Sequence, residues 1–272
     1  MNPTQHDIAS FQSFIWDFYA REGRTFPWRN VDDPYRVVVS EIMLQQTQTY
    51  RVEPKYERFI LAFPSFELLA QATLRDVLTL WQGLGYNRRG MYLHQCTQKV
   101  MAEYNGQLPA DPVVLETFPG IGKNTAGSVC AFAFNKPVVF IETNIRSVFI
   151  HSFFKDQTDV TDKQLYPLIE QTIDHTNPRE WYYALMDYGV FLKKKLSNPS
   201  RRSAHHATQS RFEGSDRQIR GMVLRYLTNV PQAPLDTVIA STKKDPERVK
   251  RIIDQLCAEK LIAVSGDIVL IA

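Results

Sequence analysis

Apolar residues recur at helical spacing along almost the whole chain, and strand-like alternation is nearly absent before the last dozen residues. The first predicted helix has an apolar face of Phe11, Phe14, Ile15 and Phe18 and ends near Gly23. The same spacing predicts further helices at residues 34–46, 52–62, 74–82, 87–104, 123–134, 143–154, 161–175 and 178–195. Short connections that contain proline and glycine join them, as in helical bundles. The chain is therefore predicted to be mostly α-helical.

The pattern changes beyond residue 195. Residues 196–215 are polar and basic and have no period, which predicts an extended loop or linker. The residues that follow indicate helices at 217–227, 235–241 and 246–259, then two strands that turn at 265–267. Three helices followed by a hairpin are typical of a winged helix-turn-helix. We therefore expect a helical domain over 1–195, a basic linker over 196–215 and a small winged-helix-like α+β domain over 216–272.

Length and composition exclude several classes of protein. The chain has 272 residues, of which 44% are hydrophobic, enough for one large domain or two smaller ones. No apolar run approaches the roughly 20 residues needed to cross a bilayer, and the N-terminus does not resemble a secretion signal. Cys96, Cys130 and Cys257 are too far apart in sequence for a disulfide framework or a CxxC-type metal site. We expect a reduced, cytoplasmic location.

The net charge of +3 is distributed unevenly. From Lys193 to Arg225 the chain has nine basic residues and only two acidic ones. Such a stretch is a candidate surface for phosphate groups, and the alternative is a solvated linker that keeps the protein soluble. The phosphate ligands that we assign to this stretch are Arg201, Arg202 and Arg211.

A glycine-rich turn between two predicted helices is the sharpest local signal. In the segment LETFPGIGKNTAG (115–127) one helix ends at Phe118 and the next begins near Lys123. The free N–H groups of such a turn and the positive helix N-terminus can bind a phosphate without reading base sequence. The alternative is a purely structural turn. The candidate phosphate ligands are Gly120, Ile121, Gly122, Lys123 and Thr125.

Two carboxylates have surroundings that suit them to chemistry. Glu41, in SEIMLQQTQ (40–48), lies among apolar and amide side chains, which favour a raised pKa and proton donation. The alternative is a surface glutamate. Glu142, in VVFIETNIRSV (138–148), stands at a predicted helix N-terminus, where the helix dipole would keep it ionised and able to stabilise a cation. Taken alone, Glu142 is better explained as a simple N-terminal capping residue.

Seven segments resemble, in order and approximate spacing, the adenine DNA glycosylase (MutY) branch of the helix-hairpin-helix (HhH-GPD) glycosylases. They are FPWR (26–29), DPY (33–35), SEIMLQQTQ (40–48), LWQGLGY (80–86), FPGIGKNTAG (118–127), the Glu142-Thr-Asn segment and ALMDYG (184–189). The resemblance covers about residues 8–195. It implies two helical lobes with the active-site cleft between them, duplex DNA as partner, and removal of adenine mispaired with 8-oxoguanine or guanine.

The resemblance also implies roles for single residues. Glu41 matches the acid that protonates N7 of the flipped adenine, and Glu142 falls where the family has a catalytic aspartate that stabilises the sugar oxocarbenium ion. Asn124 stands where bifunctional relatives have a lysine that forms a Schiff base, so we expect no lyase activity. Lys123 is the preceding residue and lies about 100° round the helix, so its side chain should point in a different direction from that of Asn124. Gln46 and Tyr86 match residues that wedge into the base stack as the base leaves. The resemblance also implies Gln45, Arg29 and Asn144 at the base pocket and wedge, and Arg88 and Arg89 as further phosphate ligands.

Three departures from the family leave the substrate open. Glu142 is one methylene longer than the family's aspartate, which moves the carboxylate by about 1.5 Å. Residues 196–215 have no cysteine where most relatives have four that hold an iron-sulfur cluster, so we expect neither a cluster nor another cofactor. His205 and His206 lack the further partners that a metal site needs. The C-terminal segment is also too short for the domain with which relatives read the opposite base.

Two other functions therefore stay open. A glycosylase for a mismatched, damaged or hypermodified pyrimidine, in repair or phage defence, would use a pocket altered at Glu142 and Asn124. Pyrimidines have no N7, however, so Glu41 would need another role. A DNA-binding protein without catalysis would need only the hairpin and the winged helix, and the retained carboxylates count against it. In each case we expect a monomer, associated with the nucleoid in a prokaryotic cell.

Overall fold

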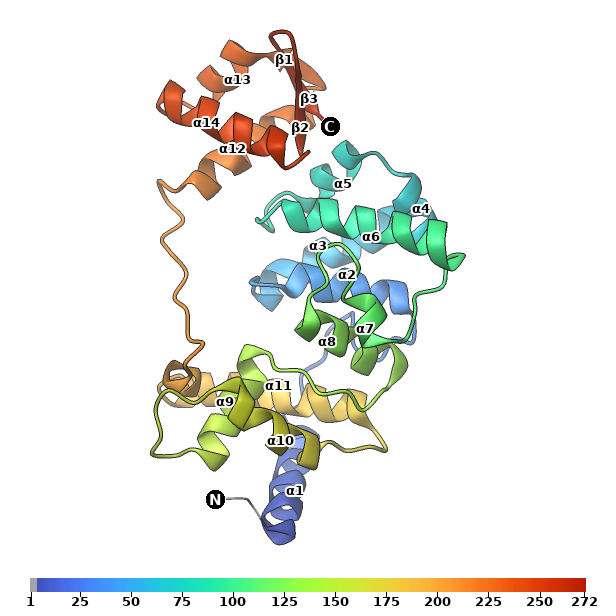
Figure 1. The fold of residues 1–272 in the computed structure, drawn as a ribbon, viewed down its shortest axis with the longest axis vertical. Coiled ribbons are helices and arrows are strands. Elements are labelled where there is room, and N and C mark those ends of the chain that lie inside the picture. The colour runs from blue at the N-terminus through green and yellow to red at the C-terminus, as the bar shows by residue number, and fades with distance from the viewer. Residues whose placement is uncertain (1–3) are drawn as a thin grey trace. The chain divides into compact units, whose positions relative to one another are not determined.

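The computed structural model describes residues 4–272 and is mostly helical (Figure 1). Within these residues the helices are α1 (Gln5–Glu22), α2 (Pro34–Leu44), α3 (Thr49–Ala62), α4 (Phe66–Gln71), α5 (Leu74–Trp81), α6 (Arg88–Tyr104), α7 (Pro112–Leu115), α8 (Lys123–Phe134), α9 (Thr143–Phe153), α10 (Asp162–Thr172), α11 (Pro178–Lys195), the 3-10 helix η1 (Pro199–Arg202), α12 (Asp216–Asn229), α13 (Leu235–Ser241) and α14 (Pro246–Ala258). The strands are β1 (Gln232–Pro234), β2 (Ile262–Ser265) and β3 (Ile268–Ile271). None of the described helices is long and apolar enough to cross a membrane.

The predicted fold class is confirmed, and the predicted helices are present with ends that differ by a few residues. The sequence pattern missed α4 because its six residues are too few to show a helical period; Ser65 caps it by accepting a hydrogen bond from the N–H of Leu68. The pattern also missed β1, a three-residue strand that ends in Pro234. The helix expected to end at Phe118 ends at Leu115 instead.

Contacts divide the chain into two compact units. Unit 1 contains the residues up to Val37, Ala110–Thr117 and Ile121–Thr208, and unit 2 contains Val38–Pro109, Phe118–Gly120 and Gln209–Ala272. Each unit is therefore built from segments that are far apart in sequence. The domain boundaries that we predicted at residues 195 and 215 follow the sequence pattern rather than these contacts, and they stay predictions.

In unit 1 the helices α9 and α11 pack so closely that their backbones are in contact. Gly189 of α11 faces the start of α9, and a Cβ atom there would lie 2.5 Å from the carbonyl oxygen of Asn144. A larger residue at 189 would thus push the two helices apart. Aromatic rings of α1 and α9 fill the space beside α11, with Phe11 packed on both Phe149 and Trp181. This packing fixes the position of the N-terminus of α9, where Glu142 lies.

A buried ion pair joins two of the motifs on which the family resemblance rests. Asp187 of ALMDYG accepts hydrogen bonds from both terminal nitrogens of Arg29 of FPWR, at 2.8 and 2.7 Å. It also accepts from the backbone N–H of Arg24, at 2.7 Å. The Arg29 guanidinium lies 4.5 Å from the centre of the Tyr183 ring. These contacts explain both motifs as structural elements of unit 1.

We expect Asp187→Asn to lower the free energy of unfolding by about 3–5 kcal/mol, because it leaves the Arg29 charge buried without its counter-ion. Urea unfolding followed by circular dichroism measures the loss. The matched control is Asp32→Asn, which breaks the exposed pair between Asp32 and Arg179 and should cost less than about 1 kcal/mol. Equal losses in the two variants would contradict the structural role of Asp187.

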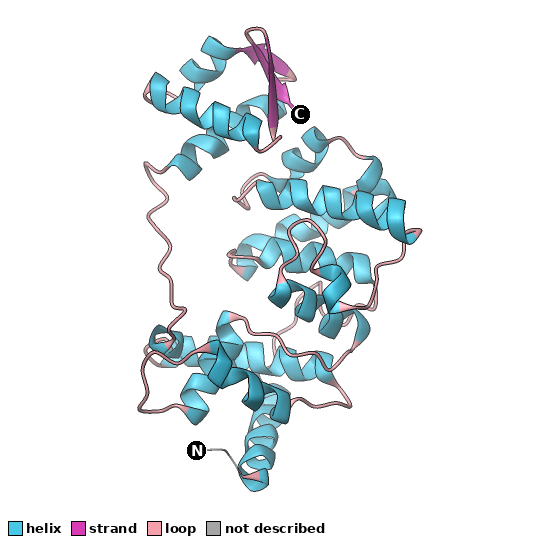
Figure 2. Ribbon diagram, in the orientation of Figure 1, coloured by secondary structure: helices cyan, strands magenta, loops and turns pink. Residues whose placement is uncertain are grey.

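In unit 2 the C-terminal helices and strands share a hydrophobic core with α5 and α6. Leu78 of α5 and Met91 of α6 belong to the same buried cluster as Val223 and Leu227 of α12. The three strands form an antiparallel sheet in the order β1-β3-β2, the only sheet in the described residues (Figure 2). Three helices and this sheet give the predicted winged-helix order. The C-terminal module, residues 216–272, is thereby docked on α5 through α12.

Candidate active site

Glu142 is the N-cap residue of α9, and its carboxylate bends back onto the helix. One carboxylate oxygen accepts hydrogen bonds from the backbone N–H groups of Asn144, at 2.7 Å, and Ile145, at 2.9 Å. The other accepts from the side-chain amide of Asn144, at 3.1 Å. The predicted position at a helix N-terminus is therefore confirmed, and Glu142 itself forms the cap. The bonds hold the carboxylate in one orientation.

The pKa of Glu142 is raised above its ordinary value, and burial is the largest cause. The charge of Lys193 and the hydrogen bonds from Ile145 and Asn144 lower this pKa but do not outweigh burial. We expected the helix N-terminus to keep the group ionised; its N–H groups do act in that direction, but burial acts against them and has the larger effect on the pKa. The reason is that a charge removed from water loses more solvation energy than the helix N-terminus returns.

Lys193 of α11 stabilises the orientation of the Glu142 carboxylate through Asn144. Its Nζ donates a hydrogen bond to the side-chain oxygen of Asn144 at 2.8 Å, while the amide nitrogen of the same Asn144 donates to Glu142. Asn144 is thus held at both ends and positions the carboxylate. In the sequence pattern, Lys193 is marked only as part of a basic stretch. No local signal in the sequence marks this role, because the contact joins residues 49 positions apart.

We expect Lys193→Met to move the acidic limb of the pH–rate profile to higher pH. If ionised Glu142 is needed for activity, the rate falls as the pH drops through the Glu142 pKa. Removing a positive charge that lowers this pKa raises it further, so activity is lost at a higher pH than in the parent. Lys193→Arg keeps the charge and should leave the limb close to its original position. An unshifted limb in Lys193→Met would show that Lys193 does not control this carboxylate.

Asn124 lies at the start of α8 and holds the segment that leads to Glu142. Its side-chain oxygen accepts a hydrogen bond from the backbone N–H of Ile141 at 3.1 Å. The neighbouring Lys123 points elsewhere, as expected, with its Nζ 4.7 Å from the centre of the Tyr166 ring. The resemblance implies a lysine at this position in bifunctional relatives. Here the side chain is an amide, and it holds the backbone of Ile141 in place.

The predicted glycine-rich turn precedes α8. Gly120 has a φ of +75°, and a Cβ atom there would lie 2.8 Å from the Cβ of Tyr92, so only glycine fits. Gly122 is the N-cap of α8 and is open to solvent on its Cβ side. Ile121 between them is buried, so its side chain contacts the core. The turn has the backbone geometry for a phosphate site, and phosphate binding by its residues, Thr125 included, stays a prediction.

Glu41 lies in α2, in the part of that helix that belongs to unit 2, and it is half-buried. Glu142 belongs to unit 1, so the two candidate carboxylates are positioned by different units. Gln45, one helical turn after Glu41, donates a hydrogen bond from its amide to the carbonyl of Gly120 at 3.2 Å. This contact connects the SEIMLQQTQ segment to the glycine-rich turn.

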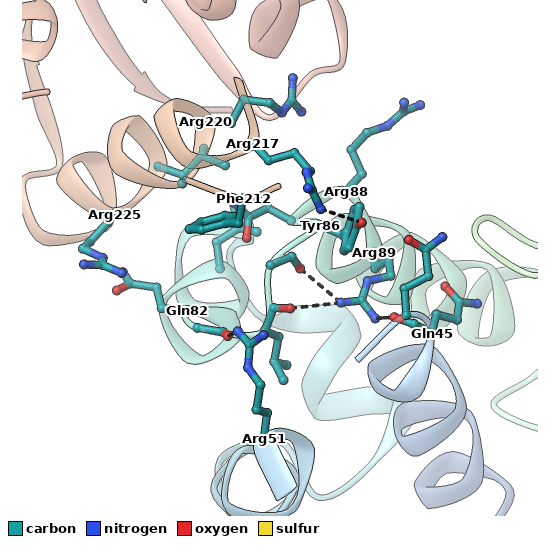
Figure 3. A pocket seen from close by; sticks show the side chains of 18 of the residues that line it. Gln45, Arg51, Gln82, Tyr86, Arg88, Arg89, Phe212, Arg217, Arg220 and Arg225 are labelled. Atoms are coloured by element: carbon teal, nitrogen blue, oxygen red, sulfur yellow. Dashed lines mark hydrogen bonds between the residues drawn. The ribbon is translucent and has the colours of Figure 1, made fainter. Parts of the chain in front are cut away.

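The predicted wedge residues Gln46 and Tyr86 both occupy left-handed backbone conformations, with φ values of 53° and 47°. Such conformations are strained for residues other than glycine and occur preferentially at functional sites. Together with Gln45 they line one pocket of about 900 Å³ in unit 2 (Figure 3). The structure therefore brings these three candidates together.

Three arginines that we predicted to contact DNA make their contacts inside the fold instead. Arg29 pairs with Asp187 as described. Arg89 is buried and donates to the carbonyls of Ile42 and Met43 at the end of α2, at 2.9 and 3.0 Å. Arg202 donates to the carbonyl of Phe154 after α9, at 2.6 Å. The physical reason for the last two is that helix C-termini leave carbonyl groups without partners, which a guanidinium can satisfy.

The other predicted phosphate-binding arginines remain on the surface. Arg201 and Arg211 are exposed. Arg88 is half-exposed, lies over the Tyr92 ring at 5.3 Å and is 3.7 Å from Glu259. Of the arginines predicted to bind phosphate groups, these three side chains stay accessible.

Residues 196–208 do not fit an iron-sulfur cluster. They contain no cysteine, and the described part of the chain has no group of three or more His, Cys, Asp or Glu side chains placed to hold a metal ion. Protein contacts hold the segment in place: Ser203 forms a parallel bridge with Val160, and the Asn198 side chain accepts from the backbone N–H of Ser200. Arg202 adds its contact with α9.

Comparison with known proteins gives one family. Residues 39–172 match the family model described as HhH-GPD superfamily base excision DNA repair protein. The adenine DNA glycosylase of Mycolicibacterium smegmatis is 32% identical over 283 residues, which cover 96% of this chain and 94% of that protein. That of Buchnera aphidicola subsp. Baizongia pistaciae is 34% identical and that of Homo sapiens 32%, over 70% and 68% of this chain. The chain spans 54% and 36% of the lengths of these two relatives.

Solved structures show the same fold. A thermostable thymine-DNA glycosylase superposes with a TM-score of 0.64 and 24% identity, covering 75% of this chain and 99% of that one. A trapped endonuclease III–DNA covalent intermediate gives a TM-score of 0.54 and 17% identity, covering 70% and 86%. At these identities the likeness concerns the fold alone.

Proposed function

This chain belongs to the adenine DNA glycosylase family of the HhH-GPD base excision repair superfamily, and from this premise we propose that it is a monofunctional DNA glycosylase. It flips a base out of duplex DNA and hydrolyses the N-glycosidic bond, which leaves an abasic site. The base that we propose is adenine mispaired with 8-oxoguanine or guanine. The observation that carries the proposal is the oriented carboxylate of Glu142, held by α9, Asn144 and Lys193.

The proposed mechanism divides the work between the two carboxyl groups. Glu41 donates a proton to N7 of the flipped adenine, so that the electron pair of the C1'–N9 bond can leave with the base. Glu142, ionised and held in a fixed orientation, stabilises the positive charge that develops on the sugar. Water then adds to C1' and completes the hydrolysis. Flipping is required because the enzyme cannot reach the glycosidic bond inside the duplex.

We expect the enzyme to cleave no strand by itself, because Asn124 cannot form an imine with the sugar. Product strands should break only after alkali or heat, and borohydride should trap no covalent complex on gels. The positive control for the trap is Asn124→Lys, which restores the lysine of bifunctional relatives. Efficient trapping by the parent would overturn the monofunctional assignment, and its loss in Lys193→Met would identify the lysine responsible.

A second candidate substrate is a mismatched, damaged or modified pyrimidine. The observation that favours it is Glu142 at the position of the family's aspartate, because the longer side chain alters the pocket. The retained Glu41 favours adenine, since only a purine has an N7 to protonate. A panel of duplexes with different target bases separates the two substrates.

We further propose that the enzyme works without an iron-sulfur cluster and without another cofactor. The support is the cysteine-free segment of residues 196–208, which is anchored by protein contacts where most relatives have the cluster. Duplex DNA is the proposed partner, contacted by the glycine-rich turn and by the exposed Arg201 and Arg211. We propose a monomer located with the nucleoid or in the cytoplasm.

A further inference from the structure

The residues that follow α11 fold back onto α9. Residues 196–204 contain the 3-10 helix η1, which packs on α9. Pro199 and Ser200 of η1 are buried, and so is Ser203 directly after it. The segment belongs to unit 1, together with α9, α10 and α11. We call residues 196–204 the α9 brace.

Arg202 attaches the brace to the C-terminal end of α9. Its Nη1 donates to the carbonyl of Phe154 at 2.6 Å and also to that of Lys155, and its Nη2 donates to the carbonyl of Ile150 at 3.3 Å. Helix C-termini leave carbonyl groups without partners in the helix, and here one half-buried guanidinium binds three carbonyls at such an end. The contacts of Arg202 are thus those of a structural link between η1 and α9.

Hydrogen bonds also fix the two ends of the brace. At its start the side-chain oxygen of Asn198 accepts from the N–H of Ser200 at 3.1 Å and from the hydroxyl of Ser200 at 2.9 Å, which caps η1. At its end the N–H of Val160 donates to the carbonyl of Arg202, and the N–H of Ala204 donates to the carbonyl of Val160, both at 3.0 Å. The backbone of the brace is therefore held on α9 and on the loop that follows α9.

The last turn of α11, which directly precedes the brace, carries Lys193. This turn contains three consecutive lysines, of which Lys194 and Lys195 are exposed while Lys193 reaches Asn144. The last turn of a helix opens more easily than its middle, because it has fewer backbone hydrogen bonds. A lysine side chain also loses much rotamer freedom when it is held in one place. The contact between Lys193 and Asn144 thus requires a backbone that does not move away from α9.

The charges around α9 separate the effect of position from a direct electrostatic effect. Lys193 is the charged side chain that acts on the Glu142 carboxylate. Arg146 acts on Lys193 and is itself paired with Asp162 of α10 at 2.9 Å. Arg202 lies at the opposite end of α9, where burial and then the Arg202 charge lower the pKa of His151. A change at Arg202 therefore reaches Glu142 through the positions of the helices.

We propose that the α9 brace fixes the last turn of α11 against α9, and that Arg202 is the positioning residue that secures it. With the brace in place, Lys193 stays on Asn144, and Asn144 keeps the Glu142 carboxylate in its orientation. The proposal rests on the proposed function in one respect, the role of Glu142 in hydrolysis. It gives the basic stretch after α11 a task inside the catalytic unit as well as at its surface.

The test follows the titration of Glu142 in the full chain, without DNA. Carboxyl groups of carbon-13-labelled glutamate are observed by NMR over a range of pH, and the Glu142 signal is the one that Glu142→Gln removes. Lys193→Met defines the full effect of losing the lysine charge, a higher Glu142 pKa. Arg202→Met should raise this pKa by at least half as much, because the freed turn lets Lys193 leave Asn144. The double variant should titrate like Lys193→Met alone.

The matched control is Arg179→Met. Arg179 also lies in unit 1 and donates from its guanidinium to a carbonyl near a helix C-terminus, that of Ala133 in α8, at 3.2 Å. Its loss should lower the unfolding temperature and leave the Glu142 pKa at the parental value. Asn198→Ala is a milder second variant, which removes the cap of η1 and should raise the Glu142 pKa by less than Arg202→Met. It keeps the test decisive if Arg202→Met does not fold.

DNA binding and base release provide a second readout. Arg202→Met should keep the parental DNA affinity and the parental slope of log affinity against log salt, and release the base about 10- to 100-fold more slowly, as expected for a misplaced catalytic group. A phosphate ligand would instead lose about 0.9 of that slope. Arg202→Lys keeps one donor for the Phe154 carbonyl and should recover part of the rate.

The proposal is overturned if the Glu142 pKa in Arg202→Met is parental, or if Arg179→Met raises it equally. It is also overturned if the double variant shows the sum of the two single shifts, because Arg202 would then act independently of Lys193.

The titration also separates this proposal from the proposed function. A parent that releases no base from any duplex, but whose Glu142 pKa responds to Arg202→Met as described, would refute the glycosylase and keep the brace. A parent that releases a base while the Glu142 pKa ignores Arg202→Met would refute the brace and keep the glycosylase.

Discussion

Glu142→Gln should bind duplex DNA at least as tightly as the parent and release the target base about 10²- to 10³-fold more slowly. The amide keeps the size of the side chain, so the cap of α9 can persist through its remaining oxygen. It has no charge to offset the positive charge of the oxocarbenium ion, which is the physical reason for the loss. Single-turnover release with enzyme in excess measures the rate, and anisotropy measures the affinity.

Glu142→Asp separates the two candidate substrates. Aspartate is a favoured N-cap residue, so the start of α9 should keep its hydrogen bonds. If the pocket takes adenine in the ordinary way of the family, the shorter acid should preserve or raise adenine release. If the aspartate variant loses excision of whichever base the parent removes, the extra methylene belongs to a rebuilt site, and the adenine proposal fails.

Glu41→Gln is the second variant with a large expected effect, a loss of base release by a factor of about 10² to 10⁴ with unchanged DNA affinity. Glutamine has nearly the same shape but cannot donate a proton as a carboxylic acid does. The matched control is Glu57→Gln, an exposed residue of α3 in the same unit, which should leave the release rate unchanged. A Glu41→Gln enzyme with parental rate would exclude proton donation by this residue.

Local patterns predicted the parts of this molecule that depend on local interactions. Helical spacing of apolar residues located most helices, and the apolar run before Glu142 placed it at a helix N-terminus, where it caps α9. Glycines at 120 and 122 predicted the turn because a left-handed φ and a close approach to Tyr92 require them. Each of these features depends on residues near one another in the chain.

Features that depend on distant residues were not predictable in the same way. A basic side chain on a helix looks the same in sequence whether it faces solvent or the carbonyls of another helix, so Arg89 was mistaken for a phosphate ligand. Asp187 is 158 positions from Arg29, and no local pattern reveals their pairing. The pKa of Glu142 depends on its burial and on the charge of Lys193 in α11. Neither can be deduced from the position of Glu142 at a helix N-terminus.

The docking of the C-terminal module on α5 also depends on residues that are far apart in the chain. The sequence indicated a separate winged-helix-like module, and its internal order is present. Its apolar residues, however, also pack on Leu78 and Met91, and Arg217 contacts Tyr86. Amphipathic helices show which face is buried but not which partner covers it, so the pocket emerged only from the structure.

Alkali-dependent cleavage of a panel of end-labelled duplexes tests the central claim most directly. Each duplex carries one mismatched or modified base, including adenine opposite 8-oxoguanine, adenine opposite guanine and thymine opposite guanine, together with a fully paired control. The proposed function predicts cleavage at the adenine position after alkali, none before it, and none in the fully paired duplex. Cleavage confined to a pyrimidine would replace adenine as the substrate, and intact strands across the whole panel after alkali would contradict the assignment as a DNA glycosylase.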